Sequence, residues 1–470
     1  MSDFNPSVCE IQKAEIISYN NTTKRDITSN FIGRFEINQS MDAVAYSGWL
    51  FVVDTIGILD GLPIRGEETL NLWLKGMDLG TEVRLSTRIH KVSDITPTQS
   101  SNGVTYKLHF VSKTTFNSTT KRVTEAHVDT VSTMAYKMFN SYYAKLGFGT
   151  SKRDNDGKKL LPFNSYRYPI IDEPTRQFIV QPTYPSTNLI IPRLTPSEAM
   201  FFVAARAYNP DTPSQTFRFF ETLENYYFCT DEYFLKGITA EDVVPMYYAP
   251  IVSYDAVNAA GQLNRIETLH VLSKGIDTST DLFSGSYRNE VVEIDFIRRR
   301  LDISKFNYDD ARHIDMTGTT KSISNNPHTE QFRKDTFTEN NARRFMIFRN
   351  YTRQGDMAST LRADEKLAEI VHNRVSYYHH LNNTSVMAGL KGRLDIRPGM
   401  IVDLQIKNLD GISASIGINQ TMSGRYLVQS TMHSRDDEGT LNTMLKMAKF
   451  DWSAQAQTKI AESADAPRST

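Results

Sequence analysis

Two Glu-x-x-His pairs have the spacing that metal-binding helices use. Glu369 precedes His372 by three residues, and Glu267 precedes His270 by the same spacing. Pairs of this kind on facing helices build di-metal carboxylate sites. The second pair falls in a segment whose residue pattern predicts a strand, so the two pairs are not equivalent. We therefore interpret these histidines as surface residues.

Other histidines are weaker candidates for metal ligands. His379 and His380 are adjacent, so their side chains point to different faces of a helix. A polar segment further upstream contains the possible ligands His313, Asp315, His328 and Glu330. A flexible polar loop rarely holds a metal without outer partners that orient the ligands. The sequence therefore predicts no metal ligand and no cofactor.

Paired carboxylates could indicate glycoside hydrolysis. Glu221 and Glu224 lie beside Tyr226 and Tyr227 and could imitate a glycosidase pair. Acidic residues that flank a hairpin turn are, however, usually solvated. The chain contains no phosphate-binding Gly-rich loop, no nucleophile elbow and no His-Glu-x-x-His zinc motif. We predict no catalytic residue and a protein that is not an enzyme.

Charge and aromatic content argue against a nucleic-acid partner. Lys and Arg number 53 against 54 Asp and Glu, which gives a formal net charge of −1 and no concentrated basic face. The run 298–300 is Arg-Arg-Arg, which we interpret as a solvated or interface segment. An aromatic cluster comprises Phe217, Phe219, Phe220, Tyr226, Tyr227 and Phe228. A stacking platform needs interleaved basic residues, and Arg218 alone lies inside the cluster, so we predict a buried hairpin face.

Cysteine content and hydropathy limit the cellular context. Cys9 and Cys229 are too few for a disulfide framework, and we expect two reduced thiols. The first residues have no basic patch followed by an apolar stretch, so no signal peptide is expected. No apolar run approaches the roughly 20 residues that span a bilayer. We expect no membrane partner.

The N-terminal part of the chain shows strand patterns. The alternating segments are 31–37, 70–74 and 104–110, and 49–53 is a continuous apolar strand. Residues 96–103 have the composition of a hairpin loop. Short strands separated by turns favour a closed or nearly closed barrel. We therefore predict a first β-barrel domain at residues 1–120.

Residues 121–250 mix helices and strands. The apolar spacing predicts a helix from Thr130 to Tyr143. A second helix starts at Thr195, where Pro196 and Glu198 complete a capping box. Two aromatic strands, 217–222 and 226–229, follow. This region is predicted to be an α+β domain.

The C-terminal half begins with polar, irregular sequence. Residues 251–345 are predicted to be an irregular or extended insertion, with strand-like pieces at 267–272 and 291–296 and an exposed loop at 315–335. Residues 346–452 are predicted to be a second β-barrel domain with a helix from 359 to 381. Its strands are expected at 385–390, 400–406 and 424–433, and 440–449 could be strand or helix. Residues 453–470 are expected to be a flexible tail. The fold class is therefore α+β and β-rich, with two barrels and an α+β middle region.

A set of strand, turn and helix patterns at the two ends of the chain comprises residues 48–54, 62–70, 363–378, 392–400, 424–433 and 440–446. In these segments the chain resembles the baseplate hub proteins of contractile-tailed, T-even-type bacteriophages. This resemblance implies two similar, tube-protein-like barrels per subunit and a homotrimer of pseudo-sixfold symmetry. Such a trimer is a structural adaptor that joins the tail tube to the central spike.

The resemblance also implies partners and a location. The partners would be other copies of the chain, the central spike protein, the tail tube protein and the baseplate wedge proteins. The protein would lie in the baseplate of the virion after assembly in the host cytoplasm. Two alternatives stay open: the hub of a related contractile injection or secretion system, and a cell-wall hydrolase.

Overall fold

The computed structural model describes the larger part of the chain. The described residues are 8–20, 22–28, 31–55, 57–61, 64–76, 80–97, 103–151, 165–184, 186–212, 214–236, 243–248, 263–274, 283–285, 288–296, 299–307, 343–348, 351–353, 361–363, 367–382, 384–406, 419 and 422–449. Among them, the predicted β-rich α+β fold is confirmed, with a large antiparallel sheet at its centre. None of the helices in these ranges is both long and apolar enough to cross a membrane. The predicted loop 315–335 and tail 453–470 lie outside the described residues.

The N-terminal sheet contains the seven strands β1 to β7 in the order β3-β4-β7-β6-β5-β1-β2. They are β1 (Cys9–Ile17), β2 (Lys24–Asp26), β3 (Phe31–Ser40), β4 (Ser47–Asp54), β5 (Thr69–Gly76), β6 (Glu82–Pro97) and β7 (Val104–Ser112), with the short helix α1 (Ile58–Gly61) after β4. Alternate residues point inward, so Leu70, Leu72 and Leu74 of β5 meet Leu108 and Phe110 of β7 in one core. The sheet therefore curls around a single apolar centre.

The C-terminal sheet is built in the same way, in the order β16-β22-β25-β24-β23-β15. Its strands are β15 (Val244–Tyr248), β16 (Thr268–Lys274), β22 (Thr384–Lys391), β23 (Ile401–Ile406), β24 (Gly424–Arg435) and β25 (Leu441–Lys449). A bridge joins Tyr247 of β15 to Arg265, which precedes β16 in the chain. The sequence allowed either a strand or a helix at residues 440–449. The structure has a strand there, β25, because Leu441, Leu445 and Met447 alternate into the core.

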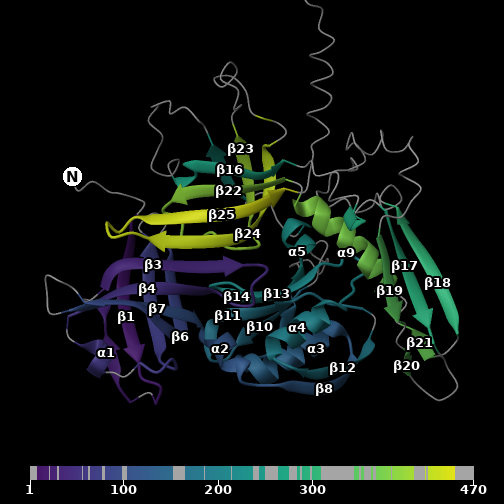
Figure 1. Cartoon of the computed structure of the whole chain (residues 1–470), viewed down its shortest axis with the longest axis horizontal. Helices are drawn as coiled ribbons and strands as arrows, with labels where there is room; N and C mark the ends of the chain where they lie inside the picture. Colours follow the sequence, from purple (N-terminus) through teal and green to yellow (C-terminus); the bar gives the residue numbers. More distant parts are fainter. Residues whose placement is uncertain are drawn as a thin grey trace, which may run out of the picture.

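One strand pair joins the two sheets side by side. Strand β24 pairs antiparallel with β3, from Ser430 opposite Ser40 to Arg435 opposite Phe35. Figure 1 shows the C-terminal sheet above the N-terminal sheet, with β24 lying directly on β3. Strands separated by almost the whole chain therefore form one continuous sheet.

The middle unit packs helices on a five-stranded sheet of order β13-β14-β11-β10-β9. Its strands are β8 (Val123–Asp129), β9 (Thr150–Ser151), β10 (Tyr166–Ile170), β11 (Glu173–Val180), β12 (Thr187–Leu194), β13 (Phe217–Glu221) and β14 (Asn225–Thr230), and β8 pairs with β12 as a separate ribbon. Its helices are α2 (Lys113–Thr119), α3 (Val131–Met138) continued by the π-helix η2 (Phe139–Tyr143), α4 (Pro196–Ala204) and α5 (Asp231–Lys236). The predicted capping box is confirmed: Thr195 N donates to Glu198 Oε2 at 2.8 Å, and Thr195 Oγ1 accepts from Glu198 N.

The remaining elements form an outer sheet and a helix. They are β17 (Arg288–Asp295), β18 (Arg300–Asn307), β19 (Arg343–Phe348), the pair β20 (Tyr351–Arg353) and β21 (Leu361–Ala363), and α9 (Leu367–Asn382). The predicted start of this helix at 359 is wrong, because Leu361 to Ala363 pair with β20. An apolar spacing that suits a helix is overridden there by strand pairing. Figure 1 shows α9 between the outer sheet and the rest of the molecule.

Candidate functional site

Polar side chains join the units of the fold at several junctions. The first is the gap that strand pairing leaves between β1 and β3. The turn between β24 and β25 enters this gap: Cys9 N donates to Gly439 O at 3.0 Å, and Val8 bridges to Thr440. Arg435 donates from Nε to Cys9 O and from Nη1 to Gly33 O, both at 2.7 Å. A C-terminal side chain thus connects two N-terminal strands.

Gly33 is required at this position for steric reasons. Its φ is +96°, a conformation that L side chains rarely adopt. A Cβ atom built on Gly33 would lie 1.5 Å from Arg435 Nη1. The guanidinium therefore occupies the space that any other residue's side chain would fill.

A second junction joins both sheets to the middle unit through one buried amide. Gln39 on β3 is 2% exposed. Its Nε2 donates to Thr431 Oγ1 on β24 at 3.2 Å, and its Oε1 accepts from Leu223 N after β13 at 3.0 Å. Because both ends of a buried amide need partners, this residue fixes the relative position of three units.

The third junction is a hydrogen bond from the N-terminal sheet to a buried ion pair of the middle unit. Glu221 is fully buried, and its Oε1 lies 2.7 Å from Arg176 Nη2. Ser112 Oγ donates to Glu221 Oε1 at 2.6 Å, and Thr115 Oγ1 donates to Oε2 at 2.9 Å. Arg176 also lies over the Tyr226 ring at 4.5 Å. Burial raises the pKa of the Glu221 carboxyl, while Arg176 and the hydroxyl donors act in the opposite direction.

Helix α9 is attached by two polar side chains. Arg374 donates from Nη2 to Gln215 O at 2.7 Å and from Nη1 to Ala205 O at the end of α4 at 3.0 Å. His372 Nδ1 donates to Asn289 on β17, and Ser304 Oγ on β18 donates to Nε2 at 2.9 Å. Burial lowers the pKa of His372 to about 4, so the ring is neutral at pH 7.

The proposed hydrolase carboxylates do not converge. The expectation that Glu221 is solvated is wrong, because the hairpin packs this residue against the N-terminal sheet. Glu224 is 49% exposed at the side chain and pairs with Arg397. One carboxylate is therefore held by an internal ion pair, and the other lies at the surface.

The residues of the two Glu-x-x-His pairs do not come together as metal ligands in the described structure. The interpretation of His372 as a surface residue is wrong, because α9 buries it against β17 and β18. Glu369 accepts from Tyr208 at 3.1 Å. Glu267 lies 3.5 Å from Lys391, and His270 is exposed. In the described part of the chain, no three His, Cys, Asp or Glu side chains are grouped to hold a metal.

Several predictions fall on residues that the structure leaves undescribed. These are the loop ligands His313, Asp315, His328 and Glu330, the residue Arg298, and the side chains of His379 and His380. By contrast, the aromatic cluster is confirmed as a buried hairpin face, with Phe219, Phe220 and Phe228 fully buried. Cys9 and Cys229 are buried and form no disulfide.

The residues that join the units were not predicted from the sequence. Gln39, Arg176 and Arg435 each contact partners tens to hundreds of positions away along the chain. The spacing of residues along the sequence does not reveal such contacts. Gly33, inside an otherwise regular strand pattern, was a signal for a close backbone approach, and the structure places Arg435 there.

Comparisons with known proteins find similar solved structures. No protein-family model matches the sequence, and no curated protein matches it significantly. A tail protein from Neisseria meningitidis is 10% identical and covers 93% of this chain and 96% of its own, with a TM-score of 0.47. The 43 kDa tail protein of prophage MuSo2 from Shewanella oneidensis is 9% identical, with coverage of 93% and 97% and a TM-score of 0.47.

A third similar structure comes from a secretion system. A component of the type VI secretion system of E. coli, described as structurally similar to T4 tail proteins gp27 and gp5, is 8% identical to this chain. It covers 94% of this chain and 77% of its own, with a TM-score of 0.38. With TM-scores below 0.5, these likenesses do not identify the family of this chain.

Proposed function

We propose that this chain is a structural baseplate hub subunit of a contractile phage tail. In this role, three copies form an adaptor that joins the tail tube to the central spike. The partners are other copies of the chain, the spike, the tube protein and the baseplate wedge proteins, and the location is the virion baseplate after assembly in the host cytoplasm. The proposal includes no catalytic role, no cofactor, and no nucleic-acid or membrane partner.

The observation that carries the proposal is the pairing of β24 with β3. It holds two curled sheets side by side in one chain. In a closed cyclic ring, three such chains would present six similar curled sheets on one side and three middle units on the other side. A part with this arrangement can connect a sixfold tube to a threefold spike. We propose that residues 1–120 and 346–452 supply the two barrels, with β15 and β16 completing the second.

The chemistry of the junctions supports a structural role. Gln39 and Arg435 use their polar atoms to hold units together, and Glu221 of the Arg176–Glu221 pair accepts a hydrogen bond from Ser112 of the N-terminal sheet. An adaptor that transmits force between a tube and a spike needs fixed relative positions of its units. A hydrolase needs two carboxylates that face a shared pocket, and Glu221 and Glu224 do not meet that requirement.

Light scattering over a concentration series tests the proposal. We expect a mass three times that of the 53.5 kDa chain when it is alone, or a complex that contains three copies of the chain after the spike protein is added. Electron micrographs of the trimer should show a ring with six similar lobes. A chain that stays monomeric with both spike and tube proteins present would overturn the proposal. Incubation with peptidoglycan should release no fragments, and release of fragments would favour the hydrolase.

A further inference from the structure

The strands of the N-terminal sheet leave a gap between their two ends. On the edge of β1 that faces away from β5, strand β2 pairs only with residues 15–17. At the other end of the sheet, β3 pairs with β24 only through residues 35–40. The first residues of β1 and of β3 therefore lie beside a gap that no described strand of this sheet fills. Backbone N–H and C=O groups in such a place still need partners.

The turn between β24 and β25 is shaped by its own hydrogen bonds. Asp436 Oδ1 accepts from Glu438 N at 3.1 Å and from Thr440 N at 2.8 Å. Gly439 N donates to Asp436 O at 3.2 Å, and Gly439 has a φ of +89°, a conformation that suits glycine. The turn can therefore hold its shape without the N-terminal sheet, and it presents Gly439 O to Cys9 N of β1.

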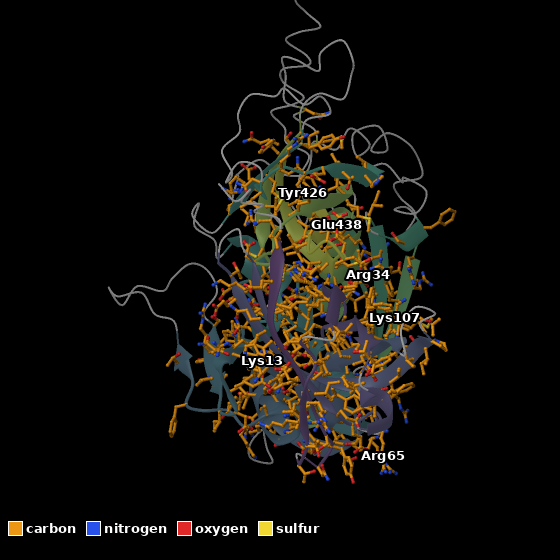
Figure 2. All side chains as sticks on the ribbon, turned by 90° about the vertical axis from the view of Figure 1, so that its left-hand side faces the viewer. Lys13, Arg34, Arg65, Lys107, Tyr426 and Glu438 are labelled. Atoms are coloured by element: carbon orange, nitrogen blue, oxygen red, sulfur yellow. The ribbon has the colours of Figure 1, made fainter. Side chains whose placement is uncertain are left out.

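Side chains of this turn reach both ends of the N-terminal sheet. The guanidinium of Arg435 donates to a backbone oxygen of β1 and to one of β3, both at 2.7 Å. Asp437 forms an ion pair with Arg34 of β3. Figure 2 shows Glu438, in the same turn, on the side of the molecule that carries Arg34. The turn thus supplies partners to both strands beside the gap.

Two leucines from the C-terminal part of the chain complete the N-terminal core. Leu441, the first residue of β25, is 0% exposed, and Leu394, between β22 and β23, is 1% exposed. Both belong to the apolar cluster that contains Phe35 of β3 and Leu72 of β5. Gly392 N donates to Leu441 O at 2.8 Å, which holds the two leucine segments together. The core of the N-terminal sheet is therefore incomplete without these residues.

We propose that residues 435–441 are a clasp that joins β1 to β3, and that the N-terminal sheet is stable only when this clasp is in place. The clasp contacts both strands beside the gap and contributes Leu441 to the core of the sheet. Pairing of β24 with β3 cannot replace it, because that ladder does not reach β1. The inference concerns a single chain and does not rest on the proposed function.

The position of the clasp in the sequence gives it a role in assembly. Strands β24 and β25 follow every other described strand in the chain, so the ribosome makes them after the N-terminal sheet. A growing chain therefore keeps this sheet incomplete until residue 441 is present. A chain that stops before the clasp presents no stable N-terminal sheet to a partner.

Hydrogen exchange of the full chain, followed by mass spectrometry, tests the clasp. Arg435→Met removes both hydrogen bonds to the backbone oxygens, and each bond to a charged group contributes about tenfold or more to an opening equilibrium. We expect the amides of β1 to exchange at least about tenfold faster than in the natural chain. The amides of β23, which pairs with the far end of β24, should exchange at the natural rate.

Two further variants make this measurement specific. Arg435→Lys keeps the charge but lacks the planar fork that spans two acceptors. In this milder variant, β1 should exchange faster than in the natural chain and more slowly than in Arg435→Met. Arg425→Met is the matched control, because it makes the same substitution in the same strand at an exposed residue opposite Asp403. It should leave the exchange of β1 unchanged.

The outcomes decide the proposal whether or not the chain trimerises. Faster exchange at β1 and unchanged exchange at β23 supports the clasp. Natural exchange of β1 in both Arg435 variants overturns it, because the N-terminal sheet would then be stable without these contacts. An increase of the same size at β23 also overturns it, since this would show a general loss of stability. If Arg435→Met fails to fold, the comparison of β1 with β23 in Arg435→Lys decides.

Discussion

Replacing Arg176 by methionine would leave the Glu221 carboxylate buried without its guanidinium partner. Glu221 is 0% exposed and receives hydrogen bonds from Ser112 at 2.6 Å and Thr115 at 2.9 Å. These hydroxyls remain in the variant, but they do not neutralise a charge. Removing one partner of a buried ion pair costs about 3–5 kcal/mol of the free energy of unfolding. We expect Arg176→Met to fall in this range.

Replacing Glu221 and keeping Arg176 should lower the free energy of unfolding by less. In Glu221→Leu, Arg176 keeps Glu173 Oε2 at 2.9 Å and Thr222 O at 2.8 Å, so about 2–4 kcal/mol is expected. The double variant removes both charges and should be more stable than Arg176→Met alone. The coupling energy from the double-mutant cycle should be about 2–3 kcal/mol.

Urea unfolding followed by tryptophan fluorescence measures these differences, since Trp49 and Trp73 lie in β4 and β5 of the N-terminal sheet. Glu224→Gln is the control: its side chain is 49% exposed, and a surface pair contributes about 0–1 kcal/mol. An Arg176→Met variant that loses less than about 1 kcal/mol would refute the reasoning. So would a double variant whose loss equals the sum of the single losses.

Three further predictions concern single side chains. Gly33→Ala should lower the urea midpoint and cost at least about 1–2 kcal/mol, because its φ is +96° and the new Cβ would meet Arg435; an unchanged midpoint would contradict this. Burial lowers the pKa of His433 from 6.5 to about 4, so the unfolded chain binds the proton first, and this residue should contribute a loss of about 3 kcal/mol of stability as the pH falls from 6.5 to 4. The measurement is urea unfolding across this pH range. The free energy of unfolding of His433→Gln should depend less on pH than that of the natural chain, and equal pH dependence would show that His433 does not cause the loss. Thr195→Ala should cost about 1 kcal/mol through loss of the cap that pairs with Glu198, read from the urea midpoint, and Thr195→Ser should retain most of the stability.

Local patterns predicted many elements correctly. The strands near 49–53, 70–74 and 104–110 are β4, β5 and β7, and the capped helix at Thr195 is α4. These elements follow from alternation with period two or from a capping motif, which depend on residues only a few positions apart. The helix expected from 359 starts at 367, because pairing of β21 with β20 overrides the apolar spacing.

The burial of charged and polar residues was harder to predict. Glu221 and His372 looked like surface residues, and both are buried. A hairpin turn and a helix face usually point polar groups to water, and only their contacts with other units reverse this. Glu221 is buried because Ser112 at the end of β7 and Thr115 of α2 pack over it, and His372 because β17 and β18 cover α9.

The sequence alone determined the β-rich α+β class, because alternation, turn residues and helix caps are local properties of the chain. Tertiary structure decided how the units combine. The pairing of β24 with β3, the insertion of Arg435 beside Gly33 and the position of Gln39 between three units join residues up to hundreds of positions apart. Their partners lie on surfaces that the strand pairing within each sheet leaves unpaired. Shape and unsatisfied hydrogen-bonding groups select these partners, and neither is visible in the spacing of residues along the chain.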